Sequence, residues 1–121
     1  MNTKRKYMED ADADLDATAD SATNPKIYDQ SEAETIDLIE RIQSGEERAF
    51  GSLMNKYRNQ VTGIAYRMVG DYDEAKDISQ MVFVKTSRNL DRFDTTKKFS
   101  TWLYRITVNA AIDYIEQNIR R

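Results

Sequence analysis

The sequence predicts an all-α fold, a compact bundle of three to four helices that follows a disordered acidic N-terminal tail. The 121 residues include one proline and four glycines, whereas an all-β domain of this size needs many turn residues to reverse its strands. Apolar residues also recur at spacings of three and four, the period of a helix with one buried face. With 40% hydrophobic and 32% charged residues, the length suits one small domain and a tail.

Residues 1–34 form the acidic leader. Within them, the segment 9–24 consists mainly of Ala and Asp and has a single large apolar residue, Leu15. Such a segment cannot bury enough apolar surface to offset the entropy lost on ordering. We therefore predict that residues 1–34 are disordered and that the folded domain occupies residues 35–121. The leader is either a solvated extension or an acidic strip that competes with nucleic acid for the basic end of the chain.

Two helices are expected in the first half of the domain. The first is short and is closed by Ser44-Gly45, and the second is the longest and ends at Gly70. Each has its apolar residues on one side. These are Ile36, Leu38, Ile39 and Ile42 in the first helix, and Phe50, Leu53, Met54, Tyr57, Val61, Ile64, Ala65 and Met68 in the second.

A third helix is predicted to start at Asp71. Glu74 follows three positions later, which resembles a capping box with Asp in place of Ser or Thr. The buried face of this helix is made of Ala75, Ile78, Val82 and Phe83. Residues 90–98 then show no sustained period, so we expect an ordered loop or a frayed joint.

The fourth helix is predicted to begin near Phe99, to run towards Asn118 and to have two distinct sides. The side expected to pack into the core holds Phe99, Trp102, Leu103, Ile106, Ala110 and Tyr114. The opposite side, expected to be exposed, holds Thr101, Arg105, Val108, Asn109 and Ile112. Because Trp102 falls on the core side, we assign it to packing and leave it out of any ligand surface.

The composition argues against an enzyme. The chain has no cysteine and no histidine, which removes disulfides, thiolate metal sites and the usual general base near neutral pH. Neither a nucleophile–base pair nor a phosphate-binding glycine loop is recognisable. A metal site made by the carboxylates of segment 71–77 lacks the glycine and the terminal Glu of a calcium loop. We expect no catalytic residue, no metal and no cofactor, and, without a signal peptide or membrane span, a cytoplasmic location.

The net charge of −3 is unevenly distributed. Residues 1–34 hold four Lys or Arg and nine Asp or Glu, for a net charge of −5. Residues 85–121 hold eight basic and four acidic side chains, for a net charge of +4. The C-terminal third is therefore the part of the chain best suited to face the phosphates of a nucleic acid.

Five blocks, in order along the chain, resemble one protein family. They are 46–50 (EERAF), 65–70 (AYRMVG), 71–83, 90–94 (LDRFD) and 99–106 (FSTWLYRI). On these blocks, residues 35–121 are similar to the core-binding and promoter-melting domain, sigma region 2, of the bacterial sigma factors of the extracytoplasmic-function (ECF) type. The block 99–106, followed by Asn109 and Asp113, is the most specific part of the resemblance.

The resemblance implies a transcription initiation factor with two binding surfaces. One surface docks on the clamp helices of the β′ subunit of RNA polymerase core. Its implied residues, on the third helix, are Asp77, Gln80, Met81 and Val84. The other captures a base flipped from the non-template strand of the promoter −10 element and melts the duplex. Its implied residues, on the loop and the fourth helix, are Lys97, Lys98, Ser100, Thr101, Tyr104, Arg105 and Asn109.

The side-chain chemistry agrees with these implied roles. Lysines neutralise phosphates, and hydroxyls supply hydrogen bonds. Arg pairs with guanine or phosphate, and Asn with adenine. Phe93 or Tyr104 can provide an apolar or stacking wall for an extruded base.

Two departures from the family limit what carries over. The family usually has Gln-Glu where this chain has Gln80-Met81, so a flexible apolar side chain replaces one charged contact with the polymerase. Members also normally continue into a helix-turn-helix domain that reads the −35 element, whereas this sequence stops at Arg120-Arg121. We therefore expect a fragment or an unusually short member. Two further expectations are an anti-sigma factor as partner and, as the rival hypothesis, a helical protein-interaction module without a DNA role.

Overall fold

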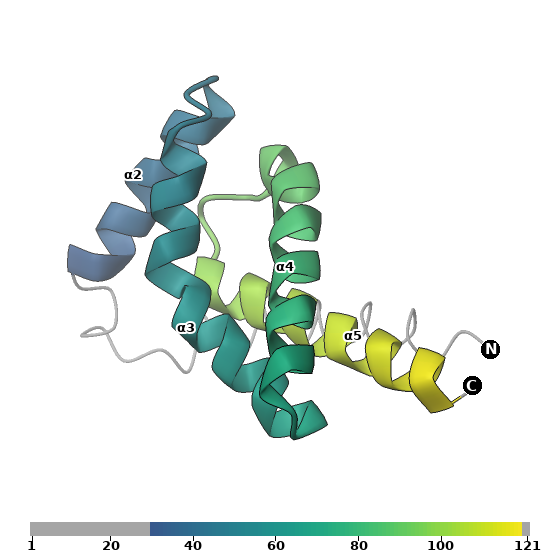
Figure 1. Cartoon of the computed structure of the whole chain (residues 1–121). Helices are drawn as coiled ribbons and strands as arrows, with labels where there is room; N and C mark the ends of the chain where they lie inside the picture. Colours follow the sequence, from purple (N-terminus) through teal and green to yellow (C-terminus); the bar gives the residue numbers. More distant parts are fainter. Residues whose placement is uncertain (1–29, 120–121) are drawn as a thin grey trace.

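The computed structural model describes residues 30–119, and every regular element in that range is helical (Figure 1). The elements are α2 (Gln30–Gln43), α3 (Ala49–Val69), α4 (Tyr72–Asn89), the short 3-10 helix η2 (Leu90–Arg92) and α5 (Phe99–Ile119). The predicted all-α class is confirmed. None of the described helices has the length and hydropathy that a membrane span requires.

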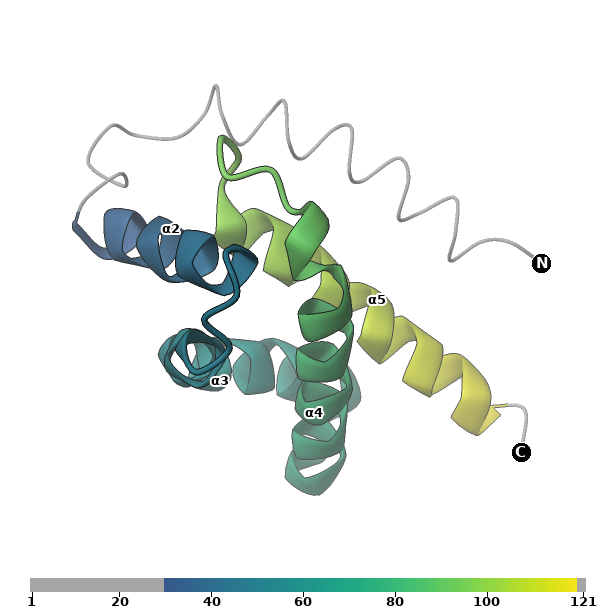
Figure 2. The same cartoon turned by 90° about the horizontal axis from the view of Figure 1, so that it is seen from above.

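Helix α3 is the centre of the bundle, because it packs against α2, α4 and α5. The chain reverses between α2 and α3 and again between α3 and α4, and α5 then crosses behind α3 and α4 (Figures 1 and 2). A joint formed by η2 and residues 93–98 connects α4 to α5. This joint carries part of the predicted DNA surface.

One contiguous hydrophobic cluster lies between the helices. Burial of an aliphatic or aromatic side chain stabilises the fold by about 1.5–3 kcal/mol, so this cluster is the main source of stability. Its members are Ile39, Leu53, Met54, Tyr57, Val61, Ala65, Ala75, Ile78, Val82, Leu90, Phe93, Phe99, Leu103, Ala110 and Ala111. Phe50, Met68, Phe83, Trp102, Ile106 and Tyr114 are partly buried against it.

The junction between α3 and α4 has the two caps that the sequence predicts. Gly70 adopts a left-handed conformation (φ 76°), and its N–H donates to the Tyr66 carbonyl at 2.8 Å. Glycine reaches this conformation without the steric cost that a Cβ atom imposes. Asp71 is extended, and its Oδ1 accepts from the Glu74 N–H at 2.9 Å, as an N-cap does. Together the caps fix where α3 ends and α4 begins.

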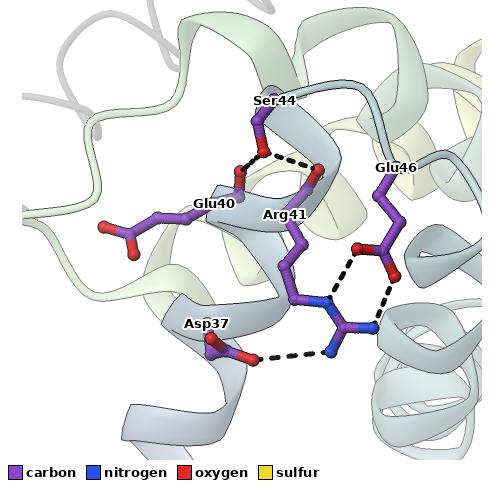
Figure 3. Close-up of polar contacts among 5 residues, drawn as sticks. All are labelled: Asp37, Glu40, Arg41, Ser44 and Glu46. Atoms are coloured by element: carbon purple, nitrogen blue, oxygen red, sulfur yellow. Dashed lines mark hydrogen bonds and ion pairs between the residues drawn. The ribbon is translucent and has the colours of Figure 1, made fainter.

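An ion-pair network spans the turn between α2 and α3 (Figure 3). The Arg41 guanidinium donates to both carboxylate oxygens of Glu46, at 3.2 and 2.6 Å, and also pairs with Asp37 at 3.4 Å. Gly45 has a positive φ (109°) within this turn. The hydrogen bond from Arg41 lowers the pKa of Glu46. Because these groups are exposed, the network orients the turn more than it stabilises the fold.

Helix α2 begins at Gln30, inside the segment predicted to be disordered. The Thr35 hydroxyl donates to the Ser31 carbonyl at 3.1 Å, and the Lys56 ammonium also donates to that carbonyl. These two bonds connect the first turn of α2 to a later residue of the same helix and to α3. The folded part therefore begins at Gln30, earlier than the predicted start at residue 35. The remainder of the predicted tail, residues 1–29, lies outside the described residues.

Candidate functional site

The predicted polymerase-contact residues form one exposed stripe along α4. Asp77, Gln80, Met81 and Val84 are all exposed. Their spacings of three, one and three residues keep them on one side of the helix, away from the buried Ile78. Met81 and Val84 expose 39% and 47% of their surface, so two neighbouring apolar side chains on this stripe are accessible to a partner.

The joint between α4 and α5 is ordered, so the alternative of a frayed joint is wrong. The Gln43 side-chain amide, at the end of α2, donates to the carbonyls of Leu90 and Phe93, both at 3.0 Å. The Phe93 N–H also donates to the Leu90 carbonyl at 3.0 Å. A single amide from a distant helix thus holds two consecutive parts of the joint in place.

Asp94 organises the segment that carries the two predicted lysines. Its Oδ1 accepts from the Thr96 N–H at 2.9 Å and from the Thr96 hydroxyl at 2.7 Å, and its carbonyl accepts from the Lys97 N–H at 2.9 Å. This is an Asx-type turn, in which a side chain takes the place of a backbone acceptor. The Thr96 hydroxyl and N–H, together with the charge of Lys97, lower the pKa of Asp94. The carboxylate is therefore ionised near neutral pH.

Aromatic rings lie beneath the joint. Phe93 packs against Trp102 and Phe99, with ring centroids 4.9 and 5.5 Å away, and the Tyr57 ring meets Phe99 edge-on at 5.3 Å. Only 7% of Phe93 is exposed, so the expectation that Phe93 can form the wall for an extruded base is wrong. The prediction that Trp102 packs against the core is confirmed. Tyr104, at 45% exposed, is the remaining candidate for a stacking wall.

The predicted DNA-contact residues that remain accessible lie at the start of α5. Lys97, Lys98, Ser100 and Thr101 are half-buried and follow one another across the end of the joint and the first helical turn. No acidic residue lies in that first turn. The positive end of the helix dipole and the two lysines therefore act together, which favours an anionic ligand.

Arg105 and Asn109 are not on an exposed face, and this prediction is wrong. They are 3% and 1% exposed, and Val108 between them is also buried. The Asn109 amide donates to the Arg105 carbonyl at 2.9 Å. The prediction assumed one buried side, whereas α5 has apolar or uncharged residues around nearly its whole circumference, a pattern typical of a helix covered on more than one side. Neither residue belongs to the accessible DNA surface.

The carboxylates of α4 do not form a metal site. Among residues 30–119, no group of three or more acidic side chains converges on a position where an ion can bind. Asp71 is engaged in capping α4.

Comparison with known proteins agrees with this helical bundle. The Sigma-70 region 2 family model matches residues 53–121. The chain is 40% identical over 79 residues to the ECF RNA polymerase sigma factor SigW of Bacillus subtilis, and 42% identical over 84 residues to the RNA polymerase sigma-H factor of Pseudomonas aeruginosa. These alignments cover 65% and 69% of this chain but 42% and 44% of the relatives, so the chain spans less than half of their length.

A solved structure extends the comparison to three dimensions. An engineered region 2 of sigmaE, determined by NMR in complex with GTAAAA, superposes with a TM-score of 0.69 at 41% sequence identity. The match covers 72% of this chain and 90% of that one. The chain therefore belongs to the Sigma-70 region 2 family, whose members are transcription initiation factor domains and not enzymes. The predicted family is confirmed.

Proposed function

We propose that this chain binds RNA polymerase core and recognises and melts the promoter −10 element. The observation that carries the proposal is its similarity, in sequence and in fold, to a sigmaE region 2 solved with GTAAAA. The alignments cover less than half of the relatives' length, so the proposal concerns the core-binding and −10 functions of this domain alone.

The α4 stripe is the proposed contact for the polymerase clamp helices of β′. Asp77 and Gln80 offer an anionic acceptor and an amide, and Met81 and Val84 offer exposed apolar surface beside them. Polar groups that fix orientation around an apolar centre are typical of a specific interface. An anti-sigma factor that covers the same stripe would compete directly with the polymerase.

The joint and the start of α5 are the proposed contact for the non-template strand. Lys97 and Lys98 neutralise phosphates, Ser100 and Thr101 supply hydrogen bonds, and Tyr104 supplies a stacking surface. Extruding a base costs a few kcal/mol, and stacking it on an aromatic ring returns about 1–3 kcal/mol. Strand capture can therefore offset the opening of weak A·T steps without ATP. The proposed site of action is the cytoplasm, where the polymerase works.

A pull-down with RNA polymerase core tests the protein side. The double variant Asp77→Ala/Gln80→Ala should fold normally and lose core affinity by at least tenfold, because truncation of a hot-spot residue costs about 2 kcal/mol or more and about 1.4 kcal/mol is tenfold in affinity. The matched control is Glu40→Ala/Gln60→Ala, which removes one acid and one amide from exposed positions outside the stripe. Equal core binding by the two double variants would contradict the assignment.

A further inference from the structure

A groove lined by polar and aromatic side chains runs between α3 and α4, next to the α4 stripe. It encloses about 280 Å³, and its lining includes Arg58 from α3 and Lys76, Gln80 and Phe83 from α4. Gln80 belongs to both the groove and the stripe, and Lys76 lies one helical turn before it. The groove is therefore a lateral continuation of the proposed polymerase-contact surface.

Two cations are held at this groove by aromatic rings. The Arg58 guanidinium lies 5.5 Å from the centre of the Phe83 ring, and the Lys76 ammonium lies 5.4 Å from the centre of the Tyr72 ring. A cation over a ring face is attracted to it and loses part of its rotational freedom. Both side chains are thus biased towards the groove before any ligand arrives.

Neither cation has a carboxylate partner in the described part of the chain. The ion pairs of Arg41 with Asp37 and Glu46, and of Lys56 with Glu34, involve neither Arg58 nor Lys76. Arg58 donates a hydrogen bond to the Asn55 side-chain carbonyl, which is neutral and leaves the charge uncompensated. A groove lined by two uncompensated cations is complementary to an anionic group.

We propose that this groove is a second contact for RNA polymerase core and that it receives an acidic side chain of the core segment docked on the α4 stripe. The proposal rests on the proposed function. The groove lies along residues 72–83, and the joint that carries the DNA surface starts after residue 89. At 1.5 Å per residue, Lys76 is about 20 Å from the end of α4, so a base held at the joint lies well away from the groove. A protein ligand of the stripe, by contrast, is already adjacent to it.

The contact also orients the partner. Asp77 on the stripe accepts hydrogen bonds or pairs with a cation, whereas its neighbour Lys76 in the groove requires an anion. A docked segment must therefore place a hydrogen-bond donor or a cation beside Asp77 and a carboxylate beside Lys76. In the reversed orientation the carboxylate of the segment would lie beside Asp77, and this repulsion disfavours that orientation.

The test is the double variant Arg58→Ala/Lys76→Ala, with Arg48→Ala/Arg67→Ala as the control that removes the same charge from exposed positions outside the groove. Core affinity and its salt dependence are measured by competition, strand affinity by fluorescence anisotropy, and folding by thermal melting. The groove variant should bind core about tenfold more weakly with a shallower salt dependence, and the control should stay within about twofold of the parent.

Three outcomes contradict the inference in distinguishable ways. Equal core affinity of the groove variant and its control, while Asp77→Ala/Gln80→Ala loses binding, overturns the groove contact and leaves the proposed function intact. A loss confined to strand binding makes nucleic acid phosphate the occupant and overturns the inference. No detectable core binding by the parent chain removes the proposed function and the inference together.

Discussion

Tyr57 connects three parts of the fold through one side chain. Its hydroxyl shares a 2.8 Å hydrogen bond with Thr35 of α2, and its ring meets Phe99 of α5 edge-on. Burial raises the pKa of the Tyr57 phenol, which keeps it neutral and able to donate. The periodicity of the sequence places Tyr57 in the core but gives no sign that its hydroxyl bonds a threonine 22 residues earlier.

Tyr57→Phe should lower the free energy of unfolding by about 1 kcal/mol, the typical net value of a buried hydrogen bond. The ring contacts remain, and Thr35 keeps its bond to the Ser31 carbonyl, so the loss is confined to one interaction. Urea denaturation measures the change in the free energy of unfolding. Tyr66→Phe, on an exposed tyrosine of α3, is the control and should change little. A loss no larger than that of the control would show that the bond to Thr35 contributes nothing.

Asp94→Ala should loosen the joint and weaken strand binding, because the turn that positions Lys97 loses its acceptor. Asp94→Asn keeps a side-chain oxygen for the Thr96 N–H and should retain part of the affinity. Amide exchange at Thr96 and strand anisotropy measure the two effects. Asp91→Ala, which removes an exposed acid from η2, is the control. Protection at Thr96 that survives Asp94→Ala would contradict the role of Asp94.

The lowered pKa of Asp94 fixes the pH dependence of the joint. A carboxyl whose folded pKa lies below its unfolded value contributes its full stability above the unfolded pKa, and the contribution disappears as the pH falls through the folded pKa. The order of the joint should therefore be constant near neutral pH and decline only in acid. The protection factor of the Thr96 amide, which is its exchange rate corrected for the intrinsic rate, measures the order of the joint at each pH.

At the scale of elements, the helices could be predicted because each has a strong local signal. One residue, Gly70, predicts the end of α3, and one residue, Asp71, predicts the start of α4. The apolar residues of α3 recur with helical spacing along the whole helix. The start of α2 could not be predicted, since its partners on α3 are about 25 residues away. The surroundings of α5 could not be predicted either, because α5 has few charged residues and the one on its predicted outer side, Arg105, is buried.

The joint shows the same division between local and distant signals. Asp94 and Thr96 form a turn whose residue types are visible in the sequence. Gln43 bonds carbonyls 47 and 50 residues later, and only the packing of α2 beside the joint creates that contact. The accessible lysines could be found from composition. The place of Arg58 over the Phe83 ring could not, because it depends on the packing of α3 against α4.

The start of α2 gives a prediction at the element scale. Deletion of residues 1–29 should leave the melting temperature nearly unchanged, whereas deletion of residues 1–34 removes the first turn of α2 and the Ser31 carbonyl that Thr35 and Lys56 bond. Loss of these bonds should cost about 1 kcal/mol, equivalent to about 4–8 °C in Tm for a domain of this size. Calorimetry measures the melting temperatures of the two truncated chains. Equal melting temperatures would contradict a structural role for the first turn.

At the scale of the whole molecule, net charge is separated along the chain, and the basic part contains the proposed DNA surface. Residues 1–34 carry a net charge of −5 and residues 85–121 a net charge of +4. The proposed polymerase-contact stripe lies on α4, and the joint that carries the proposed DNA surface follows that helix in both sequence and space (Figure 2). Binding of the polymerase and of DNA can therefore occur on the same domain without competing for the same residues.

Strand binding by the joint should depend on salt, because Lys97 and Lys98 act through phosphate neutralisation. For a single strand, each phosphate contact contributes about 0.7 to the slope of log K against log salt. Lys97→Ala and Lys98→Ala should each reduce the slope by about that amount and leave sequence preference unchanged, since phosphates carry no sequence information. Tyr104→Ala should instead weaken binding by about 1–3 kcal/mol with little change in slope, because stacking releases no counterions.

The measurement is fluorescence anisotropy of non-template −10 strands and scrambled strands across a range of salt concentrations, with and without polymerase core. Arg67→Ala, which removes an exposed charge from α3 far along the chain from the joint, is the matched control and should leave the slope unchanged. Equal slopes for Lys97→Ala, Lys98→Ala and Arg67→Ala would mean that the lysines act only through net charge. Undetectable strand binding by the parent chain, even with core present, would contradict the DNA assignment itself.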